Sequence, residues 1–153
     1  MAESTFIYVT YIRTRPDALW RALTDSDFIP QYWLGVRAES GWRVGAPWKL
    51  VLPDGRTADS GEILEFEPPR RLAIKWKNEF MPEIMAEGWS HCLFEIEPEG
   101  EAVKLTVTHS IPVENSKLVV AVSGGWPKIL SNLKSLLEGG QAVVQRKPEA
   151  AQA

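Results

Sequence analysis

His109 is the residue of this sequence best suited to acid–base chemistry, because histidine is the side chain that most readily gains or loses a proton near neutral pH. It follows Val103, Leu105 and Val107 at every second position, and every second residue of a strand points to the same face. We therefore expect His109 to face the interior near a strand end, where it would orient a ligand or transfer a proton. The alternative, which we prefer, is a histidine hydrogen-bonded to the start of the last helix, since buried polar groups usually have local partners.

Cys92 is the only cysteine and a conceivable nucleophile. If residues 98–101 form a hairpin loop, Ser90 faces His109 and Cys92 is a diagonal neighbour of the histidine, about 7–8 Å away. A lone cysteine among apolar residues usually acts as an inert small hydrophobe, and no candidate oxyanion hole lies beside it. We therefore predict no catalytic residue. His91 has the opposite strand parity, so the pattern gives no His/Cys metal site, and we expect no cofactor.

Glu62 is a candidate buried acid, since it shares the strand alternation of Leu64 and Phe66. The alternative, which we prefer, is a carboxylate at a strand end that reaches solvent or an arginine. An enzyme acting on a polyketide or similar ring would need Glu62 and His109 as its acid–base groups. The pattern places no second carboxylate beside Glu62.

The elements that must position these residues are mostly strands. A β-branched and aromatic run at residues 6–13 predicts the first strand. Pro16 then opens a helix, and a second short helix runs to about Trp33, which is a candidate for the rim of a pocket. Between residues 48 and 109, apolar and polar residues alternate, as in an antiparallel sheet with one covered face.

The last predicted element is a helix with an apolar stripe at spacings of three and four. Gly124 and Gly125 precede it, Pro127 opens it and Gly139 stops it. A helix is ~10–12 Å across, whereas six strands at ~4.8 Å spacing span more than twice that width. The sheet must therefore curl around the helix, which tends to leave a cavity. We predict a pocket lined by Trp48, Glu62, Phe66, Trp76, Phe94, Leu105, His109, Trp126, Leu130 and Leu133. The alternative is a filled core. For any one of these aromatic residues, we prefer packing in the core to contact with a ligand.

Residues 78–88 connect two strands and carry the large apolar side chains of Phe80, Met81, Ile84 and Met85. A surface loop must bury such residues somewhere. It would form a lid over the pocket mouth, or pack on the short helices or on a second subunit. The sequence does not decide between these, and it leaves the oligomeric state open.

Composition excludes several classes of protein. The net charge is -3 and no basic face is visible, which excludes a nucleic-acid binder. No apolar run approaches the ~20 residues of a membrane helix. With one cysteine and no basic apolar leader, we expect a cytoplasmic protein without disulfides.

The order of strand, two short helices, strand meander and long helix resembles the START-like superfamily, also called SRPBCC or helix-grip proteins. Within it, the chain is similar to bacterial proteins related to the C-terminal domain of activators of the 90-kDa heat-shock chaperone ATPase. The resemblance covers about residues 5–140 and rests on the segments 16–24, 42–45, 61–65, 68–72 with Trp76, 105–109, 124–127 and 130–139.

The resemblance implies an α+β fold in which a curved antiparallel sheet of about six or seven strands wraps a long C-terminal helix. We expect one domain over residues 1–144 and a frayed tail at 145–153. The leading functional hypothesis is binding of a small hydrophobic, lipid-like or aromatic ligand without catalysis. The alternatives are a protein-interaction module or co-chaperone, with an apolar outer patch at Val51, Ile63 and Leu93, and a polyketide cyclase-like enzyme.

Overall fold

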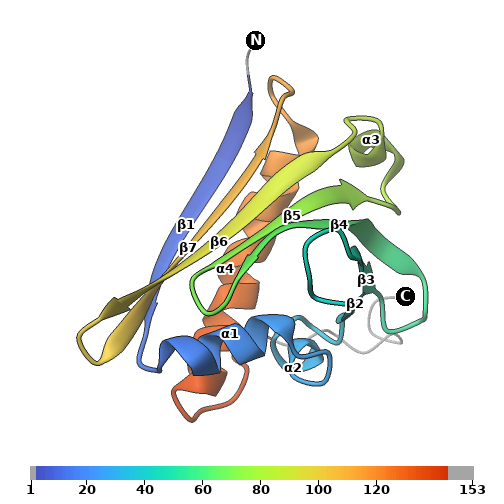
Figure 1. Cartoon of the computed structure of the whole chain (residues 1–153). Helices are drawn as coiled ribbons and strands as arrows, with labels where there is room; N and C mark the ends of the chain where they lie inside the picture. Colours follow the sequence, from blue (N-terminus) through green and yellow to red (C-terminus); the bar gives the residue numbers. More distant parts are fainter. Residues whose placement is uncertain (1–2, 145–153) are drawn as a thin grey trace.

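The computed structural model describes residues 3–144, so the tail expected at 145–153 lies outside the described residues. Figure 1 shows one layer of strands against one long helix. The elements in chain order are β1 (Ser4–Ile12), α1 (Pro16–Thr24), α2 (Ile29–Tyr32), β2 (Arg37–Ser40), β3 (Pro47–Val51), β4 (Thr57–Glu67), β5 (Arg71–Asn78), α3 (Pro82–Met85), β6 (Ser90–Glu99), β7 (Ala102–Ile111) and α4 (Lys117–Leu137).

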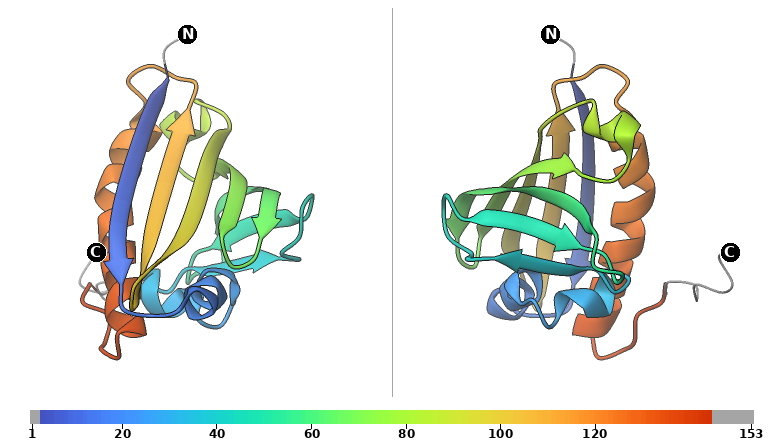
Figure 2. Two further views of the ribbon diagram at one scale, coloured as in Figure 1. Left: turned by 60° about the vertical axis from the view of Figure 1, so that its left-hand side comes forward. Right: turned by 90° about the vertical axis from the view of Figure 1, so that its right-hand side faces the viewer.

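The sheet is antiparallel throughout, with seven strands in the order β1-β7-β6-β5-β4-β3-β2. It curls so that α4 lies along its concave side, while α1 and α2 close one end and α3 sits at the other (Figures 1 and 2). The predicted helix-grip architecture is therefore confirmed, with both short helices after the first strand. Most of the core lies between the concave face and the second half of α4.

The predicted start of the last helix was wrong, because α4 begins at Lys117 and contains Pro127 in its interior. The side chain of Ser116 caps the helix by accepting from the Val119 amide. Glu87, from the segment before β6, accepts hydrogen bonds from the amides of Lys117 and Leu118 at 2.7 and 3.2 Å. These contacts satisfy amides that a helix start leaves free. Because Glu87 lies far away in sequence, the local pattern around Pro127 could not reveal this start.

A register shift in β4 turns Glu62 outward, which overturns the candidate buried acid and agrees with the preferred alternative of a carboxylate that reaches solvent. Ile63 pairs with Ile74 and Glu65 with Ala73, which leaves Leu64 as the extra residue of a bulge. Ile63 is fully buried and Leu64 is 37% exposed. A bulge inverts the alternation on either side of it, so Glu62 points outward and is exposed.

The β6–β7 hairpin is also tighter than predicted. Glu99 pairs with Ala102, so that Cys92 lies directly opposite His109 rather than diagonal to it.

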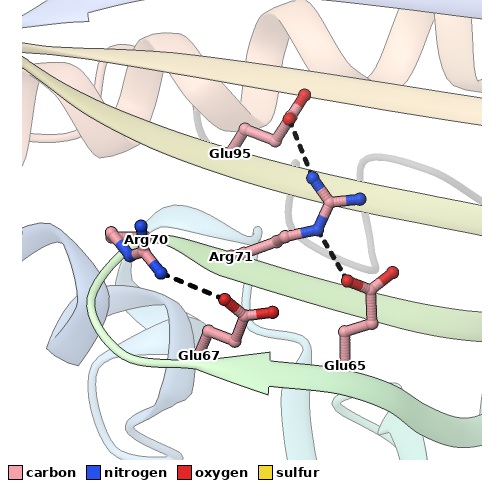
Figure 3. Close-up of polar contacts among 5 residues, drawn as sticks. All are labelled: Glu65, Glu67, Arg70, Arg71 and Glu95. Carbon is pink, nitrogen blue, oxygen red and sulfur yellow. Dashed lines mark hydrogen bonds and ion pairs between the residues drawn. The ribbon is translucent and has the colours of Figure 1, made fainter.

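The outer face of the sheet carries ion pairs where β4, β5 and β6 run side by side. Arg71 bonds Glu65 at 2.6 Å and Glu95 at 3.1 Å, which links the three strands (Figure 3). The apolar patch predicted on this face does not form, since Val51 and Ile63 are buried. The exposed apolar side chains of β1 are Ile7, Val9 and Tyr11, all on one face of that edge strand.

Candidate functional site

A pocket of about 430 Å³ lies between the first half of α4 and the strands β3 to β5. Its helical wall is formed by residues spaced by three and four along α4, which are Leu118, Ala121, Val122, Gly125, Trp126 and Ile129. The second half of the helix carries Leu130 and Leu133 into the filled core. The apolar face of α4 therefore lines a pocket along its first half and packs into the core along its second half.

The segment that follows β5 forms another wall of the pocket. Phe80, Met81 and Ile84 line it, and the side chain of Asn78 accepts from the amides of Phe80 and Met81. Ile84 packs against Leu118 of α4, so the segment packs on the long helix rather than on α1 or α2. Phe80 is 45% exposed, which places it at the mouth.

Three tryptophans meet at the inner end of the pocket. The ring of Trp33 stacks on Trp76 with centroids 6.2 Å apart and meets Trp126 edge-on at 5.2 Å. Trp76 and Trp126 also meet edge-on at 5.8 Å. All three line the pocket. They give it a rigid aromatic wall of the kind that binds flat or cationic groups.

Asp59 is the one charged side chain among the described residues that line this pocket. Its Oδ1 accepts from Trp76 Nε1 at 2.9 Å and is 3.5 Å from Asn78 Nδ2. Burial raises the pKa of Asp59 to about 6; the hydrogen bond from Trp76 opposes the rise and the charge of Glu79 adds to it. An acid with this pKa is largely ionised at neutral pH and still within reach of protonation.

His109 is fully buried, as predicted, but it does not line the pocket. Trp126 Nε1 donates to His109 Nδ1 at 3.2 Å, and Ser90 Oγ lies 3.0 Å from Nε2. Because an indole N–H can only donate, Nδ1 is the acceptor and the neutral ring carries its proton on Nε2. Nε2 then donates to Ser90, whose hydroxyl donates to the carbonyl of Trp76 at 2.9 Å.

This hydrogen-bond chain holds His109 in one tautomer. Burial, and to a lesser extent the charge of His91, lowers the pKa of His109 to about 3. The preferred prediction of a hydrogen bond to the last helix is correct in kind, although the partner Trp126 lies in mid-helix rather than at its start. Glu62 is on the opposite face of the sheet, so the acid–base pair required by the enzyme hypothesis is not formed.

The other predicted pocket residues separate into four groups. Trp76 and Trp126 line the pocket. Trp48 and Phe94, with Trp76, border a void of only about 20 Å³ deeper in the core. Phe66 packs edge-on against Trp20 of α1 with centroids 5.2 Å apart. The remaining aliphatic positions, Leu105, Leu130 and Leu133, are buried in the core.

Sequence reasoning missed Asp59 altogether. The one signal in the sequence is an Asp within a strand, where Asp is depleted; its partner Asn78 across β4 and β5 is set by the register of the two strands. Within residues 3–144, no group of three or more His, Cys, Asp and Glu side chains could hold a metal ion. Over the same range, no helix is long and apolar enough to cross a membrane.

Comparison with known proteins identifies the family. Residues 13–138 match the family model described as Activator of Hsp90 ATPase homolog 1-like protein. A search of curated proteins gives no match. CalU16 from Micromonospora echinospora is 25% identical with a TM-score of 0.71, over 88% of this chain and 76% of that one. An Hsp90 activator from Plasmodium falciparum, PFC0360w, is 23% identical with a TM-score of 0.71, over 87% and 95% of the two chains.

DynU16, a protein of the dynemicin biosynthetic locus, is 22% identical with a TM-score of 0.72, over 90% of this chain and 48% of that one. The likeness to PFC0360w and DynU16, both below 25% identity, establishes a shared fold. The family model covers most of the chain. On that basis, the chain belongs to the family of Activator of Hsp90 ATPase homolog 1-like proteins.

Proposed function

We propose that this protein binds a small apolar ligand in the pocket between α4 and the strands β3 to β5. The observation that carries the proposal is a pocket of about 430 Å³ with largely apolar and aromatic walls. Small-molecule sites are typically concave, mostly apolar and on the order of 300–1,000 Å³, with a few polar groups that orient the ligand. Asp59 is such a group here.

The position of the pocket also supports the proposal. It occupies the place where one helix is too narrow to cover a curled sheet of seven strands. It differs from a surface hollow of similar volume, which is lined by Arg56, Thr57, Glu79 and Phe80, in its largely apolar and aromatic lining. The proposal assigns the protein to the cytoplasm, since its only cysteine is buried and unpaired.

Two adjacent glycines provide a matched test. A Cβ added at Gly124 or at Gly125 meets no atom within 4 Å, so either residue accepts a side chain. Gly125 lines the pocket, whereas Gly124 is exposed and does not. Gly125→Leu is expected to abolish binding of apolar probes such as 1-naphthalenemethanol, measured by quenching of tryptophan fluorescence. Gly124→Leu should bind them as the wild type does.

Native mass spectrometry of the purified protein, followed by extraction and identification of any released molecule, gives a direct readout. A co-purifying apolar molecule in a stoichiometric complex with wild type and Gly124→Leu, but not with Gly125→Leu, would establish the site. Equal probe binding by both glycine variants would place any bound molecule elsewhere and refute the proposal.

A second candidate function is interaction with a chaperone of the Hsp90 type. It is favoured by the family and by the exposed strip of Ile7, Val9 and Tyr11 on β1. Apolar residues gathered on one exposed face often mark a protein contact. The purified protein should then stimulate the ATPase of an Hsp90 chaperone, and Ile7→Glu with Val9→Glu should remove the stimulation. Stimulation that survives this double change would exclude the strip as the contact.

A further inference from the structure

Resting on the ligand-binding proposal above, we propose that the ligand is an apolar amine whose ammonium group pairs with Asp59. The negative charge of the pocket, the free acceptor of its carboxylate and its aromatic surfaces all favour this class of ligand.

The charge of the pocket has one sign. Asp59 contributes a carboxylate, and no Lys, Arg or His lies among the described residues that line the site. Within residues 3–144, Asp59 forms no ion pair. Glu79 adds further negative potential nearby. A poorly solvated carboxylate without a counter-ion is unfavourable, and a bound cation would remove that penalty. A ligand carboxylate would instead be repelled.

The carboxylate also has a free acceptor. Trp76 Nε1 and Asn78 Nδ2 both approach Oδ1 of Asp59, so Oδ2 is the oxygen without a hydrogen bond among the described residues. Among the described residues, every fully buried side-chain nitrogen or oxygen has a hydrogen-bond partner. Since Oδ2 has none, it is not fully buried and is accessible from the pocket. Since Asp59 lines the pocket, Oδ2 is available to an N–H⁺ donor. Charge-assisted hydrogen bonds of this kind are roughly twice as strong as neutral ones.

The aromatic wall fits the same ligand. Trp76 donates to Asp59 and meets Trp33 and Trp126 within 6.2 Å. An ammonium group beside Asp59 would thus lie close to several indole rings, and cations are attracted to the faces of such rings. The apolar part of the ligand would contact the side chains of α4 and the segment after β5, such as Val122 and Met81.

Three probes of one shape test the inference. They are 1-naphthylmethylamine, 1-naphthalenemethanol and 1-naphthoic acid, which present a cation, a neutral donor and an anion on the same ring system. Wild-type protein at pH 7.5 is expected to bind the amine about 10-fold more tightly than the alcohol and to show no saturable binding of the acid. This series needs no variant, so it stands even if a substitution impairs folding.

Asp59→Asn then isolates the carboxylate while keeping its size and an acceptor for Trp76. The amine should lose its advantage over the alcohol in this variant. Glu83→Gln is the matched control, because it removes one carboxylate from an exposed position on α3 that does not line the pocket. It should retain the full preference for the amine.

The outcomes separate the two proposals. Equal affinity of wild type for amine and alcohol, or an amine preference that persists in Asp59→Asn, would overturn the amine assignment while leaving apolar binding intact. If no probe binds wild type, the binding proposal itself fails.

Discussion

Asp59 and His109 are two interior groups whose environments both favour the uncharged form. Burial raises the pKa of Asp59 from 3.8 to about 6 and lowers the pKa of His109 from 6.5 to about 3. Their effects on stability have opposite signs. Folded Asp59 binds more protons than the unfolded chain between pH 3.8 and 6, so its environment costs stability as pH rises. Folded His109 binds fewer, so its environment costs stability as pH falls.

Asp59→Asn is expected to stabilise the unliganded protein at pH 7.5, by at most about 3 kcal/mol. The variant removes the buried charge and retains an oxygen that can accept from Trp76. At pH 3.5, below the pKa of both folded and unfolded Asp59, the carboxyl is mostly neutral in either state and the gain should largely disappear. Urea unfolding of wild type and variant at the two pH values measures this. A gain of equal size at both would show that the charge is not its source.

His109→Gln should destabilise the protein at pH 7 by roughly 1–3 kcal/mol, because an amide cannot keep both bonds, to Trp126 and to Ser90. The gap between wild type and variant should narrow as pH falls from 6.5 towards 3, because the imidazole of the unfolded wild type takes up a proton that the buried imidazole does not. Denaturant titrations across this range test the sign. Probe affinity at pH 7.5 should change little, since His109 does not line the pocket.

At this scale, strand alternation predicted which residues face inwards except beside the bulge in β4, and it predicted poorly what they contact. It placed His109 and Trp76 inside correctly. It missed Asp59, whose significance depends on Trp76 and Asn78 in the neighbouring strand. The alternation of residues along a strand tells which face of the sheet a side chain occupies. Its hydrogen-bond partner in the next strand depends on the register between the two strands. A polar residue in a strand is therefore recognised as functional only once its cross-strand neighbours are known.

Among the elements, α4 depends on a contact far away in the chain. Glu87 accepts from Ser116 Oγ and from the first amides of the helix, all within 3.2 Å. The same segment carries Phe80, Met81 and Ile84 into the pocket. Glu87 therefore connects the two walls of the pocket, because it belongs to the segment after β5 and caps the helix that forms the other wall.

Glu87→Ala should therefore cost about 1–2 kcal/mol of stability, as loss of a helix cap typically does, and should also weaken probe binding. Burial tends to raise the pKa of Glu87, but the hydrogen bonds from Ser116 and the helix amides, together with the charge of Lys117, outweigh it and lower that pKa. Its contribution is thus present above the ordinary pKa of glutamate and is lost as the pH falls below it. Thermal melts and probe titrations measure the two effects. Glu83→Ala, on the exposed side of α3, is the control and should change neither.

The same scale explains which elements the sequence revealed. Elements with a regular apolar pattern and a residue that marks their start, such as α1 with Pro16 at its first position, were predicted closely. The bulge at Leu64 and the start of α4 at Lys117 were not. A bulge depends on the partner strand, and the start of α4 depends on Glu87. Pro127 in mid-helix misled the prediction because proline ordinarily marks a helix start.

For the whole molecule, the pocket lies between a region with many buried apolar contacts and a region with few. On one side, β6, β7 and the second half of α4 share the filled core around Leu105 and Leu133. On the other, the segment from Asn78 to Gly88 and the first half of α4 meet the end of β7 in the small cluster of Ile84, Ile111 and Leu118. Regions with few buried contacts open at lower free energy than the core. One wall of the pocket therefore belongs to the part of the fold that opens at the lower free energy.

A bound apolar amine should accordingly stabilise the molecule unevenly. Ligand present at 100 times its dissociation constant adds about 2.7 kcal/mol to global stability. In hydrogen exchange, protection should rise most for residues 78–88 and the first half of α4, because both contact the ligand and open without global unfolding. Exchange in β6 and β7 already requires near-global opening and should slow only through the global term. Gly125→Leu should show no ligand-dependent protection in either region. Slowing confined to β6 and β7 would mean that the ligand binds in the deeper core, near Trp48 and Phe94, rather than in this pocket.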